Sequence, residues 1–293
     1  MAQPFYVVRS NNADAPSQIR RPHMIRKDLP ALCKQLRRDI INMIANGASG
    51  HPGGSLSVID MLVALYFGKM NLDPCEPVNP QRDRLVLSKG HDAPALYACL
   101  GELGLIEKEE YTTFRQLHSR LQGHPDRNKC PGGEVSTGSL GQGCSIATGM
   151  ALGAKACGNP CHIYAVLGDG ECQEGIVWEA SMAAAHYRLD NLTFLIDHNG
   201  LQIDGTNDEV MSLGDLKKKF ESFGFITLVV ENGNDVEQIL TALDTPVCKG
   251  KPRCIICETV KGKGVSFMEY QVGWHGKAPN EEQRRAALRE LGE

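Results

Sequence analysis

Apolar residues along this chain follow two distinct spacings. Between Leu32 and Ile44 they recur every three or four residues, which predicts an amphipathic helix that ends near Gly47. Elsewhere, short apolar runs bounded by glycine or charged residues predict buried strands. The predicted strands are 84–88, 162–167, 192–196, 225–231 and 253–258.

Helical patterns lie between these strands. We expect helices at about 55–67, 93–103, 107–117, 140–156, 175–187, 235–243 and 281–291, and a loop at 201–213. Strands that alternate with helices predict an α/β fold, a doubly wound and mostly parallel sheet flanked by helices. With no internal repeat or dividing linker, residues 28–293 should form one domain after a polar extension at 1–27.

The segment 122–141 is rich in Gly, Pro and Ser and is too long for a simple connector. Long irregular loops inside compact domains are usually functional. This segment is therefore a candidate part of a binding site.

Composition and charge narrow the classes of function. The chain has 293 residues and a net charge of −4, which gives no electrostatic case for nucleic acid or an anionic membrane as partner. No run approaches 18 consecutive apolar residues, so we expect no membrane span. The first 25 residues lack the apolar core of a secretory signal, and we expect a cytoplasmic protein.

The chain contains eleven cysteines. Cys254 and Cys257 have the spacing of a metal or redox pair, but they lie within a predicted strand. Residues three apart on a strand point to opposite faces, so this pair cannot easily share one ion. We therefore expect buried, reduced thiols that pack as small apolar side chains.

Two polar residues follow consecutive predicted strands. Asp169 lies in a Gly-Asp-Gly turn after the strand 162–167, and Asn199 follows the strand 192–196. Either piece alone is a common turn. On parallel strands, however, both would lie at the carboxyl edge of the sheet, where α/β proteins bind ligands. Carboxylate and amide oxygens are suited to Mg²⁺ or Ca²⁺ rather than to zinc.

Four of the nine histidines lie in glycine-marked loops, at His51, His91, His124 and His275. A single loop histidine is most often solvated, but four such loops favour a shared cleft. Imidazoles there could donate hydrogen bonds to diphosphate or hydroxyl oxygens and relay protons near neutral pH. The loop 136–143 precedes a helix and could direct backbone N–H groups at an anion, although it is not a Walker loop.

The segment from Gly168 to Asn199 resembles the thiamine diphosphate signature, in the form that transketolases carry. Further motifs occur in transketolase order at 49–54, 88–91, 123–125, 136–143, 203–205 and 259–264. They cover about residues 30 to 280, so the chain is similar to the N-terminal, diphosphate-binding half of transketolase. Ser139 departs from many full-length transketolases, which have Pro there, and looks like the form found in separately encoded halves.

This resemblance implies a fold and a set of site residues. The fold is the thiamine-diphosphate-binding fold, PP-type domain. The implied metal ligands are Asp169, Asn199 and the Leu201 carbonyl, holding Mg²⁺ or Ca²⁺. The implied cofactor-binding residues are His51, His91, Gly138, Ser139, Leu140, Gly170, Glu171, Asn199 and His275. The implied catalytic residues are His51, His124, His275 and Glu174.

Glu174 has two interpretations. It resembles the acidic residue at the subunit interface that helps to couple paired active sites in the family. An exposed acid at a helix N-terminus, stabilised there by the helix dipole, accounts for it almost equally well.

The resemblance also implies a partner. Full-length transketolases run to more than twice this length, and their second half supplies the activating Glu and most residues that grip the sugar phosphate. The chain therefore resembles one half of a split transketolase, active with a separately encoded C-terminal subunit that carries the pyrimidine-binding and C-terminal domains, as an α2β2 heterotetramer. Such an enzyme uses thiamine diphosphate to transfer a two-carbon ketol unit from a ketose phosphate to an aldose phosphate, as in the pentose phosphate pathway.

Three alternatives remain at this stage. One is a specialised transketolase acting on a branched or sulfonated sugar. Another is a non-catalytic cofactor-binding subunit, which would need the metal site but not four histidines. The third is a magnesium-dependent hydrolase, which would need a nucleophile or a carboxylate pair beside Asp169, and no such spacing is evident.

Overall fold

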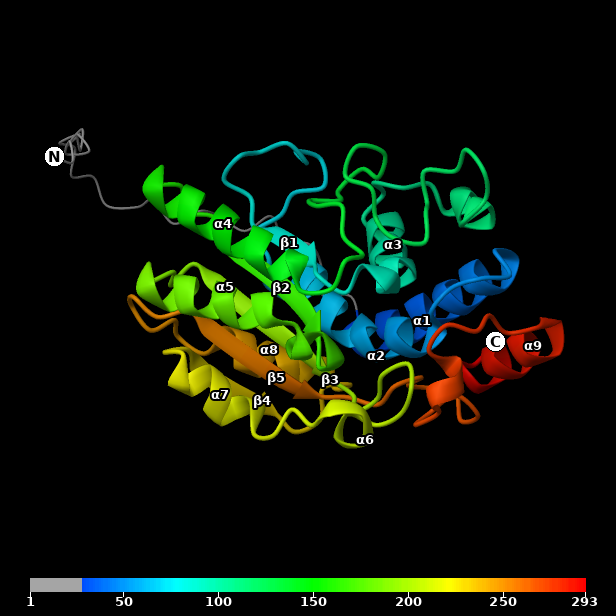
Figure 1. The fold of residues 1–293 in the computed structure, drawn as a ribbon. Helices are drawn as coiled ribbons and strands as arrows, with labels where there is room; N and C mark the ends of the chain where they lie inside the picture. The colour runs from blue at the N-terminus through cyan, green and yellow to red at the C-terminus, as the bar shows by residue number, and fades with distance from the viewer. Residues whose placement is uncertain (1–27) are drawn as a thin grey trace, which may run out of the picture.

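The computed structural model describes residues 28–293, so the predicted extension at 1–27 lies outside the described residues. At its centre is a five-stranded sheet in the order β1-β2-β3-β5-β4 (Figure 1). The strands are β1 (Arg84–Leu87), β2 (Ile163–Gly168), β3 (Leu192–His198), β4 (Ile226–Val230) and β5 (Arg253–Glu258). All four neighbouring pairs are parallel, so within the described residues the sheet is wholly parallel.

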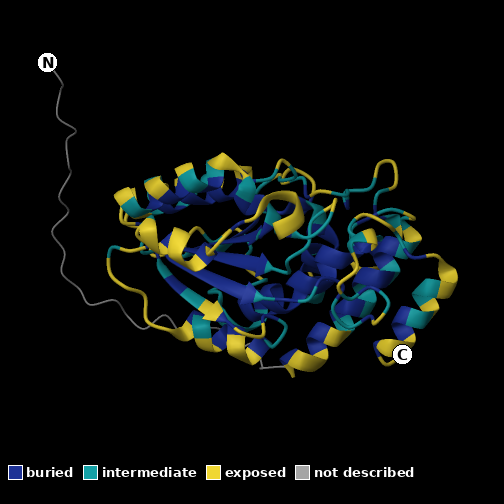
Figure 2. Cartoon of the chain, turned by 60° about the horizontal axis from the view of Figure 1, so that its bottom comes forward, coloured by how far each residue is buried: buried dark blue, intermediate teal, exposed yellow. Residues whose placement is uncertain are grey.

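Helices cover both faces of the sheet, as a doubly wound fold requires. One core contains α1 (Leu29–Asn46), α2 (Pro52–Val63), α3 (Ala93–Glu102), α8 (Val236–Asp244) and α9 (Glu281–Glu290). The other contains α4 (Gln142–Ala156), α5 (Gly175–His186) and α7 (Leu216–Ser222). Figure 2 shows the central strands buried between helices whose outer faces are exposed, and the edge strand β4 is only partly buried.

Alternation along the strands divides side chains between these two cores. Ala165 and Cys254 belong to the core beneath α4 and α5, whereas Val166 and Cys257 belong to the core beneath α2. The prediction that Cys254 and Cys257 point to opposite faces as buried free thiols is confirmed.

The structure corrects the predicted helix at 107–117. Only a 3₁₀-helix forms there, at Lys108–Thr113. Arg115 and His118 follow it with φ of 59° and 68°. This left-handed conformation is unfavourable for side chains with a Cβ and cannot continue a right-handed helix. The predicted helix is therefore replaced by a turn that redirects the chain towards the long loop.

Two short helices lie where the sequence pattern predicted none. Within the predicted loop 201–213, α6 (Asn207–Met211) begins with a capping box, in which Thr206 and Glu209 bond reciprocally to each other's backbone. Asp215 caps α7 by accepting a hydrogen bond from the Lys218 backbone. No helix within residues 28–293 is long and apolar enough to cross a membrane.

Candidate active site

The predicted oxygen ligands lie together at the carboxyl edge of the sheet. Strands β2 and β3 are neighbours, with Gly168 opposite Asp197. Asp169 follows β2 and is 3% exposed. Its carboxylate accepts hydrogen bonds from the backbone nitrogens of Gly170, at 2.7 Å, and Gly200, at 2.6 Å. These bonds fix the carboxylate at the turn that leads from β3 towards Asn199.

Asn199 and Leu201 complete this edge. Both line the same cleft as Asp169. The Leu201 carbonyl accepts a hydrogen bond from Lys261 Nζ at 2.8 Å, and a carbonyl oxygen has a second lone pair for another ligand. Residues 28–293 contain no cluster of three or more His, Cys, Asp or Glu side chains able to hold a metal. The predicted set has only one carboxylate, and its neutral oxygens still suit a hard cation.

The four loop histidines gather around this cleft, which has a volume of about 370 Å³. The His51 ring centroid lies 5.1 Å from that of His91, 5.5 Å from that of His275 and 6.3 Å from that of His124. His51 precedes α2, and His91 lies in the 3₁₀ turn after β1. Four loops that are distant in sequence therefore place their imidazoles side by side.

Burial keeps these imidazoles neutral near pH 7. Burial lowers the pKa of His51 and of His124, and it lowers the pKa of His91 well below the usual value. Burial, with the Lys261 ammonium second, lowers the pKa of His275 to about 3. Neutral imidazoles can each donate one hydrogen bond and accept another, which is what proton relay requires.

The loop before α4 brings backbone close to the histidines. Gly138 has φ of 148°, and a Cβ there would lie 2.9 Å from His124 Cδ2. Only glycine permits both this conformation and this approach. Gly138 and Leu140 line the cleft, together with Gly170.

Two predicted cofactor-binding residues need qualification. Glu171 lines the cleft, but its carboxylate is buried and accepts hydrogen bonds from the Ser88 hydroxyl and from the backbone of Gly141 and Gly168. That side chain ties three loops together, which leaves the backbone of Glu171 for a ligand. Ser139 is exposed and is the one predicted site residue of the described chain that does not line the cleft.

Glu174 also lines the cleft, at its exposed rim. It is the N-cap residue of α5, yet its side chain accepts no capping hydrogen bond within the described chain. This position fits both interpretations of Glu174, since an exposed acid at a helix N-terminus is also free to contact a partner. Its role at an interface stays a prediction.

A buried charge network beneath the cleft was not among the predicted site residues. Lys89 is 2% exposed, and its ammonium contacts both Asp92, at 2.8 Å, and Asp197. Asp197 also accepts hydrogen bonds from Ser57, at 2.6 Å, and from Thr259. Lys89, Asp197 and Thr259 lie within the motifs seen in the sequence, whereas Ser57 and Asp92 lie just after two of them, and only burial reveals the network.

Lys261 is a further residue near the cleft that the sequence did not single out. Its Nζ lies 3.0 Å from His275 Nδ1 as well as on the Leu201 carbonyl. Burial, with the Lys89 charge second, lowers the pKa of Lys261 to about 8. The lysine-glycine motif 259–264 was the available signal.

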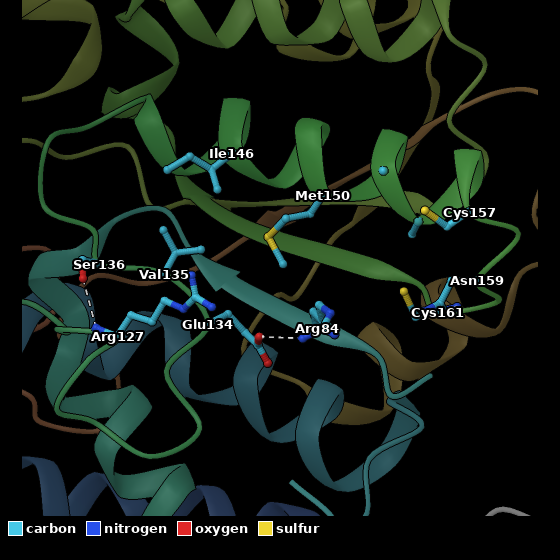
Figure 3. Close-up of a pocket in the computed structure, with 12 residues that line it drawn as sticks. Arg84, Arg127, Glu134, Val135, Ser136, Ile146, Met150, Cys157, Asn159 and Cys161 are labelled. Atoms are coloured by element: carbon cyan, nitrogen blue, oxygen red, sulfur yellow. Dashed lines mark hydrogen bonds and ion pairs between the residues drawn. The ribbon is translucent and has the colours of Figure 1, made fainter. Parts of the chain in front are cut away.

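A larger hollow of about 750 Å³ lies elsewhere, over β1 and the outer face of α4 (Figure 3). Ile146 and Met150 line it from α4, and Arg84 lines it from β1, paired with Glu134 at 3.2 Å. Its lining within residues 28–293 includes none of the four histidines. The candidate chemistry therefore belongs to the smaller cleft.

A parallel sheet with loops, buried charge and histidines gathered at its carboxyl edge defines an α/β protein that binds its ligand at that edge. The family model described as "Transketolase, thiamine diphosphate binding domain" matches residues 30–293. The chain therefore belongs to the transketolase family and contains its thiamine diphosphate-binding domain.

Relatives of two kinds match the chain. One subunit of the apulose-4-phosphate transketolase of Actinobacillus succinogenes is 41% identical over 90% of this chain and 96% of its own length. The 6-deoxy-6-sulfo-D-fructose transketolase subunit SqwG of Clostridium sp. is 41% identical with the same coverage. Human transketolase is 38% identical over 83% of this chain, which corresponds to 38% of that protein. The predicted resemblance to the N-terminal subunit of a split transketolase is confirmed.

Solved structures agree with this assignment. Transketolase from Leishmania mexicana aligns with a TM-score of 0.86 and 31% identity over 91% of this chain. Transketolase from Campylobacter jejuni aligns with a TM-score of 0.83 and 35% identity. The predicted thiamine-diphosphate-binding α/β fold is confirmed. The chain spans about 41% and 42%, respectively, of these two solved transketolases.

Proposed function

We propose that this chain, with a separately encoded partner, transfers a two-carbon ketol unit from a ketose phosphate to an aldose phosphate. The observation that carries the proposal is the shared cleft, in which four histidines lie beside Asp169, Asn199 and Leu201. Thiamine diphosphate, when bound, supplies the carbon nucleophile for breaking and forming the carbon–carbon bond. The chain's own residues bind, orient and transfer protons.

The cofactor's diphosphate would be held through a divalent cation. The Asp169 carboxylate, the Asn199 amide oxygen and the Leu201 carbonyl are hard oxygen donors that suit Mg²⁺ or Ca²⁺. Burial, with the Asp197 carboxylate second, raises the pKa of Asp169. A buried carboxylate of this kind is stabilised by a bound cation.

The remaining contacts divide between backbone and imidazoles. The proposed diphosphate contacts are His91, Gly138, Ser139, Leu140, Gly170 and Glu171, with backbone N–H groups contributing at the loops. His51, His124 and His275 would face the substrate's hydroxyl and carbonyl oxygens. A neutral imidazole can donate a hydrogen bond from its N–H to such an oxygen, and its unprotonated nitrogen can accept a proton from a hydroxyl group.

The sugar substrate has two candidates. A ketose phosphate and aldose phosphate of the pentose phosphate pathway form the main one. A branched or sulfonated sugar is the second, because two relatives are named for apulose-4-phosphate and for 6-deoxy-6-sulfo-D-fructose. Both candidates need the same ketol transfer. A purely binding subunit is less well supported, since it would not need four clustered histidines.

The partner would be a C-terminal subunit with the pyrimidine-binding and C-terminal domains, assembled as α2β2. The solved transketolases extend well beyond the part that this chain matches. The exposed Glu174, at the rim of the cleft, would lie at that interface. We place the enzyme in the cytoplasm, because its eleven cysteines are free thiols, as a reducing compartment favours.

The test is co-expression with the adjacent reading frame, followed by ketol-transfer assays over several sugar phosphates, including branched and sulfonated ones. We expect turnover by the complex and none by this chain alone, checked by mass spectrometry for a co-purified partner. Ketol transfer by the pure chain would overturn the split arrangement. Absence of transfer by an intact complex on every sugar would overturn the proposed reaction.

A further inference from the structure

Arg115 lies directly behind the histidine cleft, and neither the proposed cofactor contacts nor the proposed substrate contacts involve it. Its Nη2 lies 3.4 Å from His51 Nδ1, and its Nη1 donates to Ser49 Oγ at 3.0 Å. Arg115 does not line the cleft, whereas His51 does. The guanidinium therefore contacts the Nδ1 edge of the His51 ring from outside the cleft lining.

Three features of the fold place Arg115 here. Its backbone has φ of 59°, a conformation that is unfavourable for a non-glycine residue and that often occurs at functional sites. A Cβ on Gly123 would lie within 2.4–2.5 Å of the guanidinium, so the glycine leaves room for it. The guanidinium also lies over the ring of the buried Phe114, at 5.7 Å. Within residues 28–293 it forms no ion pair with a carboxylate.

The chemistry of this contact fixes the proton on His51. A guanidinium has five N–H donors and no acceptor, so His51 Nδ1 can meet it only as an unprotonated acceptor. The single ring proton of neutral His51 must then lie on Nε2. That atom is at the opposite edge of the ring, on the side where Gly276 follows His275.

We propose that Arg115 is a positioning residue that holds His51 as a neutral imidazole with its proton on Nε2. His51 then presents a hydrogen-bond donor to a hydroxyl or carbonyl oxygen of the sugar. The identity of the ligand as a sugar rests on the proposed ketol transfer. The position of the proton on His51 does not depend on that reaction.

The electrostatic setting of His51 agrees with this role. Burial is the largest effect that lowers the pKa of His51, and the Arg115 charge lowers it further. The Asp92 carboxylate opposes both and raises it. The other titratable groups that face His51 are His91, His124, His275 and Lys261.

Two variants and a matched control test the proposal. Arg115→Gln removes the charge and the obligatory donor, and Arg115→Lys keeps the charge. Arg120→Gln removes a cation from the same segment, one that pairs with Glu110 rather than with a histidine. Nitrogen-15 side-chain NMR of the full 293-residue chain reads the protonated nitrogen of His51, assigned by its loss in His51→Gln. The pH profile of kcat/KM is measured on the complex with its partner.

In the unmodified chain we expect His51 to be protonated at Nε2. Arg115→Gln should raise the pKa of His51 and move the acid limb of kcat/KM upward by about one pH unit, since a neighbouring charge shifts a pKa by roughly that much or more. In Arg115→Lys the acid limb should lie close to its position in the unmodified chain, because the positive charge is kept. In Arg120→Gln the limb should not move. The spectrum of the unmodified chain decides the proton position even where a variant fails to fold.

A His51 proton on Nδ1, or an equal shift in Arg120→Gln, would overturn the inference. An unchanged His51 pKa in Arg115→Gln would do the same. If the complex transfers no ketol unit while His51 keeps its proton on Nε2, the proposed reaction fails and the role of Arg115 in holding the proton stands.

Discussion

At the scale of single residues, the cleft is built by burying charge next to backbone donors. Asp169 is buried and held by two backbone N–H groups, and the Lys261 ammonium lies on the neighbouring Leu201 carbonyl. Such groups are costly to bury unless they are paired, so their presence at a ligand edge indicates a binding role.

The first prediction concerns the cation and cofactor. In the complex with the partner chain, Asp169→Ala should abolish binding of thiamine diphosphate with Mg²⁺ or Ca²⁺, because the variant removes the only charged ligand of the proposed set. Calorimetry measures the affinity, and Asp208→Ala, an exposed acid on α6, is the control. Undiminished cofactor affinity in Asp169→Ala would show that the cation lies elsewhere.

The second prediction separates two histidines of the cleft. His124→Ala should leave cofactor affinity nearly unchanged and lower kcat/KM by about 10²–10⁴-fold, the usual loss for a general acid–base group. His91→Ala should instead weaken cofactor binding first, by about 1.5–3 kcal/mol, as for one hydrogen bond to a charged group. Both constants are measured on the reconstituted complex. If the two variants lose only stability, the histidines are structural.

At the scale of elements, the parallel strands carry the site at their carboxyl ends, and a buried histidine at their other end makes the fold sensitive to acid. His162 precedes β2 and packs against Tyr164 with ring centroids 4.6 Å apart and the rings tilted by 39°. Its Nε2 lies 2.8 Å from Thr193 Oγ1 on β3. Burial, with the Arg253 guanidinium second, lowers the pKa of His162 from 6.5 to about 3. The folded protein therefore keeps the imidazole of His162 neutral where β2 and β3 begin.

The third prediction follows from this shift. Unfolded His162 takes up a proton near pH 6.5, whereas the folded form does so only near pH 3. The contribution of His162 to the free energy of unfolding should therefore be complete above pH 6.5. It should fall as the pH drops towards 3. Urea unfolding at about pH 7.5 and about pH 4.5, on either side of the unfolded pKa, should show a smaller fall in His162→Gln than in the unmodified chain. The control is His186→Gln, at an exposed position on α5, and an equal fall in all three proteins would count against His162.

At the scale of the whole molecule, the chain has the sheet and the cleft at its carboxyl edge but corresponds to about 41% of a solved transketolase. The relatives named as subunits of apulose-4-phosphate and 6-deoxy-6-sulfo-D-fructose transketolases are each covered over 96% of their own length by this chain. The reaction centre that we propose would therefore be completed by another polypeptide across the open side of the cleft.

The fourth prediction concerns assembly. The co-expressed complex should contain two copies of this 32.0 kDa chain and two of its partner, measured by light scattering after size exclusion. Glu174→Ala should weaken this assembly or the coupling between its sites, because Glu174 lies exposed at the rim of the cleft. The matched control is Glu179→Ala, an exposed acid on the same helix. A complex with one copy of each chain would contradict the α2β2 arrangement.

Much of the fold was readable from the sequence because strands and helices leave different apolar periods. All five strands and the site-bearing turns at Asp169 and Asn199 lie where the pattern predicted them. The helix at 107–117 and the loop at 201–213 were wrong in part, because a positive φ at Arg115 and a local capping box at Thr206 decide those segments. Neither feature alters the apolar period.

The sequence by itself therefore determined the sheet class, the family and which loops carry the histidines, since motifs and periodicity are local properties of the chain. Only the tertiary structure decided which charges meet. Lys89 reaches Asp197 across 108 residues, Lys261 reaches the Leu201 carbonyl, and Arg115 reaches His51. These contacts depend on the order of the strands and on a left-handed turn, and burial then sets the pKa values of the groups that meet.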